Sequence, residues 1–284
     1  MLKPIFAATA LSSFILLAGC SSDLTSEHEK EQKEEQPSSQ ETEKETEKET
    51  EKETETDKNN DSKESAQRQV EVDEAAKPGQ AGLQTLAHPE SIPVLVNKQY
   101  SLPEDYKPAD LIYPNVDFIF EDKIEKRMMR EEAGKALELM FQAAEKDNMH
   151  FAGVSAYRSH QRQIEVFNNY VAKDGEEKAK TYSAMPGTSE HETGLAIDVT
   201  THDGACAAQD CFGDTKEAAW LAEHAHEYGF IIRYPEGKEN ITGYKYEPWH
   251  IRYVGVDAAT EIFEAKITLE EYYNAVPVEA VSDK

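Results

Sequence analysis

The sequence predicts an α+β domain built from a small antiparallel sheet with flanking helices. Between residues 89 and 275, segments with apolar residues at helical spacing occur beside segments that alternate apolar and polar residues. These segments do not follow the regular strand–helix–strand order of a parallel sheet, which argues against an α/β fold. A single domain of roughly 190 residues has an ordinary size.

Helices are predicted where apolar residues recur every three or four positions. The clearest case covers residues 126–148, where Met129, Leu137 and Phe141 share one face. Further helices are predicted at residues 162–173, 216–228 and 258–265. The helix at 216–228 is followed by Gly229, the residue type that most often ends a helix.

Strands are predicted at short apolar or alternating runs, which cover residues 151–156, 195–200, 230–234 and 249–254. Residues 95–114 precede the first helix and are rich in Pro, Tyr and Asp. Because this composition favours turns over regular elements, we expect an ordered but irregular segment that wraps the domain.

The first residues have the pattern of a targeting segment. Lys3 precedes a mostly apolar run at residues 5–17, which has the length of a signal-peptide core and is short for a transmembrane helix. The run ends in LAGC, residues 17–20, which resembles a bacterial lipobox. We therefore expect residues 1–19 to be removed and Cys20 to carry a lipid that anchors the chain to the outer face of the bacterial cell membrane. The alternative is an ordinary signal peptide with an unrelated cysteine.

Residues 20–77 are predicted to begin with this lipidated cysteine and to continue as a disordered acidic tether. Its centre, residues 41–56, is the repeat ETEKETEKETEKETET, which places like charges at i,i+4 and has no apolar residue. Such a chain cannot form a core, and its coil would span roughly 40 Å or more. Residues 276–284 are predicted to form a short tail outside the domain.

The charge of the chain bears on its partners. The formal net charge is −26. A surface that binds nucleic acid needs an excess of Lys and Arg, so the composition argues against a nucleic-acid partner. We expect the chain to act as a monomer.

Cys206 and Cys211 form a close pair in the segment GACAAQDCFG. Outside the cytoplasm, such a pair more often forms a disulfide than a metal site. A single pair without a second one is a weak zinc signal. We therefore predict a small-loop disulfide, with free thiols as the alternative.

The segment SEHETGLAIDVT, residues 189–200, contains the first candidate metal ligands. Alternation places Leu195, Ile197 and Val199 on one face of a strand and Asp198 on the other. A carboxylate in the middle of an apolar strand needs a partner or a metal. His191 precedes the strand across Gly194, where a sharp change of direction is possible, so His191 and Asp198 can converge.

The segment YEPWHIRYVG, residues 246–255, supplies a second set. His250 and Arg252 share one strand face, and Glu247 lies just before the strand. Two histidines and one carboxylate with an open fourth position form a catalytic zinc site, and a further carboxylate can act as base. His191, Asp198 and His250 are therefore candidate ligands, with Glu247 as candidate base. The alternative for any single histidine is a packed or surface residue, which is the interpretation for histidines 28, 88, 160, 202, 224 and 226. Glu192 is predicted to be solvated.

Several blocks of the chain resemble a known enzyme family. SEHETGLAID matches the pattern S-x-H-x-x-G-x-A-x-D, and EPWHIRY matches E-x-W-H. Together with LVNKQYSLPEDYKPADL and SAYRSHQRQ, in that order, they resemble the VanY-type zinc D-alanyl-D-alanine carboxypeptidases of peptidase family M15. That family is related in fold to the hedgehog signalling domain. The resemblance implies that His191, Asp198 and His250 bind Zn²⁺ and that Glu247 is the general base.

The same resemblance implies roles around a substrate. Arg158 corresponds to the family arginine that meets the peptide carboxylate or the developing oxyanion, for which a guanidinium fork is suited. Gln163 and Ser189 resemble positions that contact the terminal D-residue. A structural salt bridge for Arg158, a helix-surface position for Gln163 and a turn-forming role for Ser189 are the alternatives.

The resemblance implies a zinc carboxypeptidase that removes the C-terminal D-alanine from peptidoglycan stem peptides. An L,D-carboxypeptidase acting on tetrapeptide stems is the alternative within the family, because the cleft motifs are shared. A non-catalytic cell-wall-binding lipoprotein is the alternative from another class, and the complete set of ligands and base argues against it.

Overall fold

The computed structural model describes residues 69–71 and 82–276, all within one compact unit. The predicted signal peptide at residues 1–19, Cys20, most of the predicted tether at 20–77 and the tail after residue 276 lie outside the described residues. Within the described part of the chain, no helix is long and apolar enough to cross a membrane.

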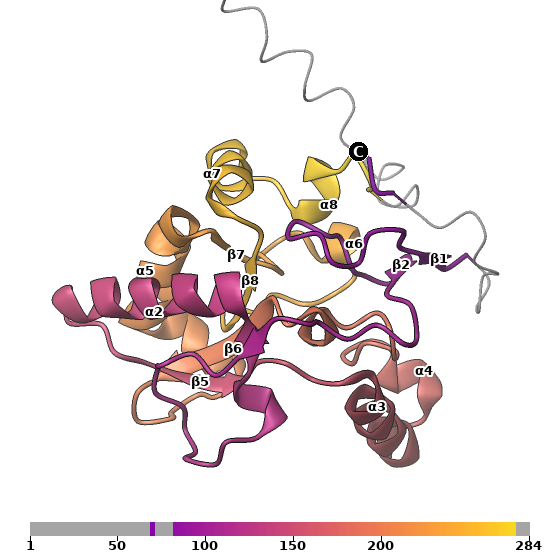
Figure 1. Cartoon of the computed structure of the whole chain (residues 1–284), viewed down its shortest axis with the longest axis horizontal. Helices are drawn as coiled ribbons and strands as arrows, with labels where there is room; N and C mark the ends of the chain where they lie inside the picture. Colours follow the sequence, from indigo (N-terminus) through magenta and orange to yellow (C-terminus); the bar gives the residue numbers. More distant parts are fainter. Residues whose placement is uncertain (1–68, 72–81, 277–284) are drawn as a thin grey trace, which may run out of the picture. The chain divides into compact units, whose positions relative to one another are not determined.

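A four-stranded antiparallel sheet forms the centre of the domain (Figure 1). Its strands are β5 (Phe151–Ser155), β6 (Ala196–Thr201), β7 (Phe230–Ile232) and β8 (His250–Tyr253). The spatial order is β5-β6-β8-β7, so β6 and β8 are the inner strands. Strands β6 and β8 come from distant parts of the sequence, and their pairing therefore brings two sequence segments together.

Helices surround this sheet, and shorter elements connect them. The α-helices are α2 (Glu131–Lys146), α3 (His160–Asp174), α4 (Glu176–Ala179), α5 (Lys216–His224), α6 (Glu239–Thr242), α7 (Val256–Ala265) and α8 (Leu269–Tyr272). The 3₁₀ helices are η2 (Glu125–Arg127), η3 (Glu190–Thr193), η4 (Asp210–Asp214) and η5 (Ala225–Tyr228). Two small strand pairs lie outside the main sheet, β1 (Gln84–Thr85) with β2 (Tyr100–Ser101), and β3 (Leu111–Ile112) with β4 (Met129–Arg130).

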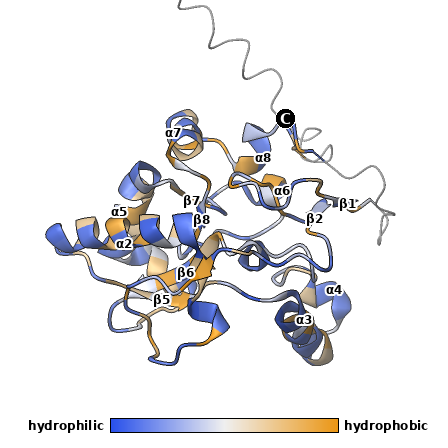
Figure 2. Ribbon diagram, in the orientation of Figure 1, coloured by the Kyte–Doolittle hydropathy of each residue, from blue (hydrophilic) through white to orange (hydrophobic). Residues whose placement is uncertain are grey.

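The core forms where helix α2 and the sheet contribute side chains to one apolar cluster. Figure 2 shows apolar residues along β5 and β6 and a mixture of apolar and polar residues along α2. From the sheet come Ile197, Val199 and Ile251, and from α2 come Leu137 and Met140, all of them fully buried. The alternation in β6 therefore places its apolar face in the core, as the sequence predicts.

The α+β prediction is confirmed, with differences at the ends of elements. The predicted helix at 126–148 begins at Glu131, because residues 125–127 form η2 and Met129 pairs with Ile112 in a two-residue strand. The predicted helix at 216–228 changes to the 3₁₀ helix η5 after His224 and ends at Gly229, which has a φ of 80°. The short helix α8 has no counterpart in the sequence predictions.

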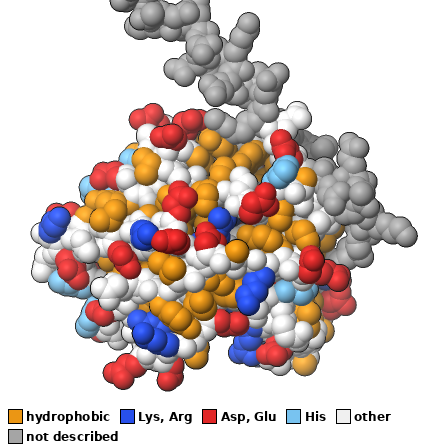
Figure 3. Space-filling model, viewed as in Figure 1, with side chains coloured by type: hydrophobic (Ala, Val, Ile, Leu, Met, Phe, Trp, Pro, Cys, Tyr) orange, Lys and Arg blue, Asp and Glu red, His pale blue; other side chains and the backbone are white. Residues whose placement is uncertain are grey.

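The surface of the unit carries acidic side chains and scattered apolar ones. Figure 3 shows one face, on which Asp and Glu are spread widely with Lys and Arg between them. Among the large exposed apolar residues are Leu139, Phe263 and Val256, which belong to α2 and α7. Isolated apolar residues of this kind are normal on a protein surface.

Helix α2 offers a direct test of the core, because two adjacent residues on it differ in burial, one buried and the other exposed. Met140 is 0% exposed, whereas Leu139 is 60% exposed. We expect Met140→Ala to lower the free energy of unfolding by about 2–5 kcal/mol through lost contacts and a cavity. Leu139→Ala should change it by about 0.5 kcal/mol or less. Urea unfolding followed by circular dichroism measures both, and equal losses would contradict this assignment of the core face.

Candidate metal centre and substrate cavity

His191 is positioned by a short helical turn that leads into strand β6. It lies in η3, which ends at Gly194 with a left-handed φ of 69°. A Cβ at this position would come within 3.0 Å of Leu111 and 3.1 Å of Arg130, so both the backbone angle and the space favour glycine. Because the chain reverses here, the imidazole of His191 lies beside the strand that follows it.

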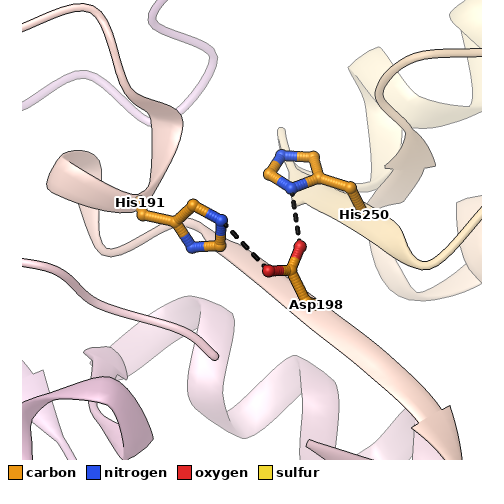
Figure 4. Close-up of side chains that lie close together, drawn as sticks. All are labelled: His191, Asp198 and His250. Atoms are coloured by element: carbon orange, nitrogen blue, oxygen red, sulfur yellow. Dashed lines mark hydrogen bonds and ion pairs between the residues drawn. The ribbon is translucent and has the colours of Figure 1, made fainter. Parts of the chain in front are cut away.

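Asp198 and His250 are brought together by strand pairing. They are direct partners in the register of β6 and β8, and their side chains therefore share one face of the sheet. The distance from Asp198 Oδ1 to His250 Nδ1 is 2.9 Å, and that from Asp198 Oδ2 to His191 Nε2 is 3.4 Å (Figure 4). All three residues are buried, and one potential ligand atom from each lies within 4.8 Å of the others.

The donor set fits a zinc ion. Two imidazole nitrogens and one carboxylate oxygen are the ligands of a catalytic zinc site with an open fourth position. The Nδ1 of His191 lies 2.8 Å from the carbonyl oxygen of Ala156, which accepts a hydrogen bond when Nδ1 carries the proton. This bond leaves Nε2 of His191 directed toward Asp198, as is usual when the other ring nitrogen of a ligand donates to a carbonyl.

The electrostatics of the cluster also suit a cation. Burial would raise the pKa of Asp198, but His191 and His250 hold it well below its usual range. Burial would lower the pKa of His250, but its hydrogen bonds with Asp198 and Glu190 raise it to about 10. The pKa of His191 is lowered, chiefly by burial. A metal ion would replace the proton that the cluster otherwise holds, because metal binding and deprotonation of ligands are coupled.

The cluster opens into a cavity of about 370 Å³ whose lining includes all three candidate ligands, Glu247 and Arg158. Burial raises the pKa of Glu247 to about 7, with His250 opposing and Asp198 and Asp210 adding to the shift. A cation held beside it would favour the ionised form. A carboxylate in this range can exchange a proton near neutral pH, which is the property a general base requires.

Arg158 and Gln163 form a connected pair at one wall of this cavity. Arg158 Nη1 donates to Gln163 Oε1 at 2.8 Å, and Gln163 Nε2 donates to the carbonyl of Ala184 at 2.6 Å. Gln163 is only 1% exposed, so it lies behind Arg158 instead of on a helix surface. Ser189 is buried and lines the cavity next to the ligand segment. Arg158 and Ser189 therefore reach the cavity, whereas Gln163 holds Arg158 in place.

The prediction that Glu192 is solvated is wrong. Its side chain is buried and accepts a hydrogen bond from the backbone N–H of Gly187 at 2.8 Å. Its second oxygen lies 2.8 Å from Nδ1 of His160. The tight turn of η3 directs Glu192 toward the preceding loop instead of toward solvent, so this carboxylate joins the ligand segment to the start of α3.

A group of buried charges next to the metal cluster is absent from the sequence predictions. Four charged side chains in this group are 0% exposed: Glu190, Arg233, Arg252 and Glu270. Glu190 Oε1 accepts from Arg233 Nε and from Arg252 Nη1, each at 2.7 Å. One sequence signal for this group is that Arg252 shares a strand face with His250. A guanidinium buried on that face implies a buried carboxylate partner.

Cys206 and Cys211 are joined by a disulfide in the structure. The loop that they enclose contributes Ala208 and Asp210 to the lining of the cavity. The backbone just before this loop is held by Asp203 Oδ1, which accepts from the N–H of Ala205 at 3.0 Å. The disulfide therefore closes a loop at the wall of the candidate site.

Comparisons with known proteins agree with this geometry. A sequence profile described as VanY, D-alanyl-D-alanine carboxypeptidase, matches residues 126–256. The Bacillus subtilis protein YodJ is 51% identical over 195 residues, which cover 69% of this chain and 71% of YodJ.

Solved structures are similar as well. The LdcB LD-carboxypeptidase is 48% identical with a TM-score of 0.69, and the match covers 75% of this chain and 97% of LdcB. The D,D-pentapeptidase VanY from a VanB-type resistance cassette, solved with Zn(II), is 34% identical with a TM-score of 0.51, covering 64% and 98%. With relatives of this identity and coverage, the chain belongs to the VanY family of D-alanyl-D-alanine carboxypeptidases.

Proposed function

We propose that the chain is a zinc-dependent carboxypeptidase that removes the C-terminal D-alanine from peptidoglycan stem peptides. The observation that carries the proposal is the convergence of His191, Asp198 and His250 on one cavity that also contains Glu247 and Arg158. Zn(II) in a solved relative and the peptidoglycan recognition named for LdcB support the choice of metal and substrate.

Each residue of the cavity has a distinct task in this proposal. When bound by His191, Asp198 and His250, zinc supplies Lewis-acid chemistry. Glu247 accepts a proton from the attacking water at its carboxylate and delivers it to the amine of the departing D-alanine. Arg158 meets the terminal carboxylate of the substrate or the developing oxyanion.

The position of Arg158 accounts for cleavage at a chain end. Its guanidinium lines the cavity and is fixed by Gln163, so it offers a preorganised site for a carboxylate near the metal ligands. The last residue of a peptide carries a free α-carboxylate next to its own peptide bond, which suits such a site. Ser189, in the same lining, is placed to donate a further hydrogen bond.

Two candidate activities differ in the configuration, D or L, of the residue before the cleaved bond. The family description supports D,D-cleavage of pentapeptide stems. L,D-cleavage of tetrapeptide stems is the second candidate, favoured by the 48% identity to the LdcB LD-carboxypeptidase, compared with 34% to the D,D-pentapeptidase. A non-catalytic wall-binding role is disfavoured, because the candidate ligands and base are all in place.

Stem peptides distinguish these activities. Purified chain is incubated with pentapeptide and tetrapeptide stems, and released D-alanine is measured with and without a chelator. We expect release from at least one stem, lost on chelation and restored by zinc. Release from the pentapeptide alone supports the D,D-activity, and release from the tetrapeptide alone supports the L,D-activity. No release from either stem by zinc-loaded protein would refute the proposed function.

The role of Glu247 can be separated from metal binding. Glu247→Gln keeps the shape of the side chain but cannot accept a proton. We expect kcat to fall by about 10²–10⁴-fold, the usual contribution of a general base, with zinc content unchanged by elemental analysis. Glu236→Gln, a change of the same kind at an exposed residue outside this cavity, should leave kcat unaltered. A near-normal rate for Glu247→Gln would show that another group is the base.

We also propose that the chain is held at the outer face of the cell membrane by a lipid on Cys20. The LAGC segment and the repetitive acidic stretch after it support this, since a spacer would let an anchored enzyme reach the wall. In a bacterial host, Cys20→Ala should move the protein from the membrane fraction to the soluble fraction. An unchanged distribution would argue against the anchor.

A further inference from the structure

We propose that Glu190 is a positioning residue that fixes the imidazole of His250 for metal binding. The inference rests on the proposed function, because it concerns the same metal centre. Glu190 directly precedes His191 in the sequence, but its carboxylate faces the other histidine of the cluster. Its Oε2 lies 3.4 Å from Nε2 of His250, while Oε1 is occupied by two arginines.

The two ring nitrogens of His250 have different surroundings. Nδ1 lies 2.9 Å from Oδ1 of Asp198, another candidate ligand, and we therefore assign Nδ1 to the metal. Nε2 faces Glu190, an acceptor that has no proton to give. The geometry therefore places the ring proton on Nε2 and leaves the lone pair of Nδ1 for the metal. A carboxylate that orients a ligand histidine in this way is a recurring feature of zinc sites.

Glu190 is itself held by a rigid frame. Arg233 donates a hydrogen bond from Nε to Glu190. Its Nη1 and Nη2 donate to the carboxylate of Glu270 at 2.9 and 2.7 Å. Arg252 donates to Glu190 and also to the carbonyls of Ile92 and Val94, at 3.1 and 2.6 Å. With both arginines engaged on several sides, Glu190 has little freedom to turn away from His250.

The frame is balanced in charge, which allows a matched comparison. Glu190 and Glu270 are both fully buried carboxylates that pair with Arg233, but only Glu190 contacts a candidate metal ligand. Glu190→Gln and Glu270→Gln therefore remove the same charge from the same cluster. In Glu190→Gln, the arginines retain the amide oxygen, so the NH₂ group faces Nε2 of His250. Nε2 must then accept a hydrogen bond, and the ring proton moves to Nδ1.

The test measures zinc affinity without substrate, by competition with a chromophoric chelator. We expect the zinc Kd of Glu190→Gln to rise about 10–100-fold, the usual effect of losing such a hydrogen-bond partner. Glu270→Gln should retain a Kd within about threefold of the unchanged chain, although both variants lose thermal stability. Equal zinc affinity in both variants would overturn the proposal and leave Glu190 with a structural role.

Two further measurements guard against a variant that does not fold. Glu190→Asp retains the charge but is one methylene shorter, and we expect weaker zinc binding than in Glu270→Asp. In the unchanged zinc-loaded chain, long-range ¹H–¹⁵N correlation spectra should show His250 with a metal-bound Nδ1 and a protonated Nε2. A metal-bound Nε2 would refute the orientation.

The outcomes separate this inference from the proposed function. If zinc binds with the expected pattern but neither stem peptide is cleaved, the proposed function fails and the role of Glu190 stands. If D-alanine is released but zinc affinity does not depend on Glu190, only the positioning role fails. If the unchanged chain binds no zinc, both fail.

Discussion

The pairing of β6 with β8 is the constraint on which the metal centre depends. Asp198 lies opposite His250, and the neighbouring positions place Ile197 opposite Ile251. A slip of one residue would exchange the two faces of a strand, burying the carboxylate in the core and exposing the isoleucine. Burial of the apolar face therefore fixes the register, and the register brings the two ligands within 2.9 Å. Packing energy on one side of the sheet thus determines the geometry of polar groups on the other.

The charges buried on the polar side of the sheet must also be paired with opposite charges. Arg233 and Arg252 have 0% exposed side chains, and unpaired charges in such positions would be very unfavourable. Glu190 and Glu270 supply the opposite charges from a 3₁₀ turn and from the short helix α8. Arg252 also reaches the carbonyls of Ile92 and Val94. The segment around Ile92 and Val94, helix α8 and the candidate metal centre are therefore joined by one network.

The sequence allows much of this to be predicted, because the signals are local. Alternation in GLAIDVT identifies the strand that carries Asp198, and a glycine after His191 indicates the turn that returns the imidazole to it. The position of Glu247 just before the second strand makes it a candidate base, and the resemblance to a family implies the same role. The short turn η3 is where prediction fails, because it has too few residues to show a period. The burial of Glu192 and the contacts of Glu190 therefore leave no pattern in the sequence. The partners of Glu190 lie 43 and 62 positions away, a separation at which a single sequence gives no pairing signal.

Two carboxylates near His250 illustrate how surroundings assign roles to the same chemical group. Burial alone would raise the pKa of Glu190, but Arg233 and Arg252 hold it well below its usual range. Glu247 lacks such a pair of arginines, and burial raises its pKa to about 7. Groups whose environments drive their pKa values apart are suited to different tasks. Glu190 remains an ionised acceptor that can hold an imidazole in place, and Glu247 can gain and lose a proton at the mouth of the same site. The buried arginines thus distinguish the carboxylate that we propose orients a ligand from the one that we propose takes part in proton transfer.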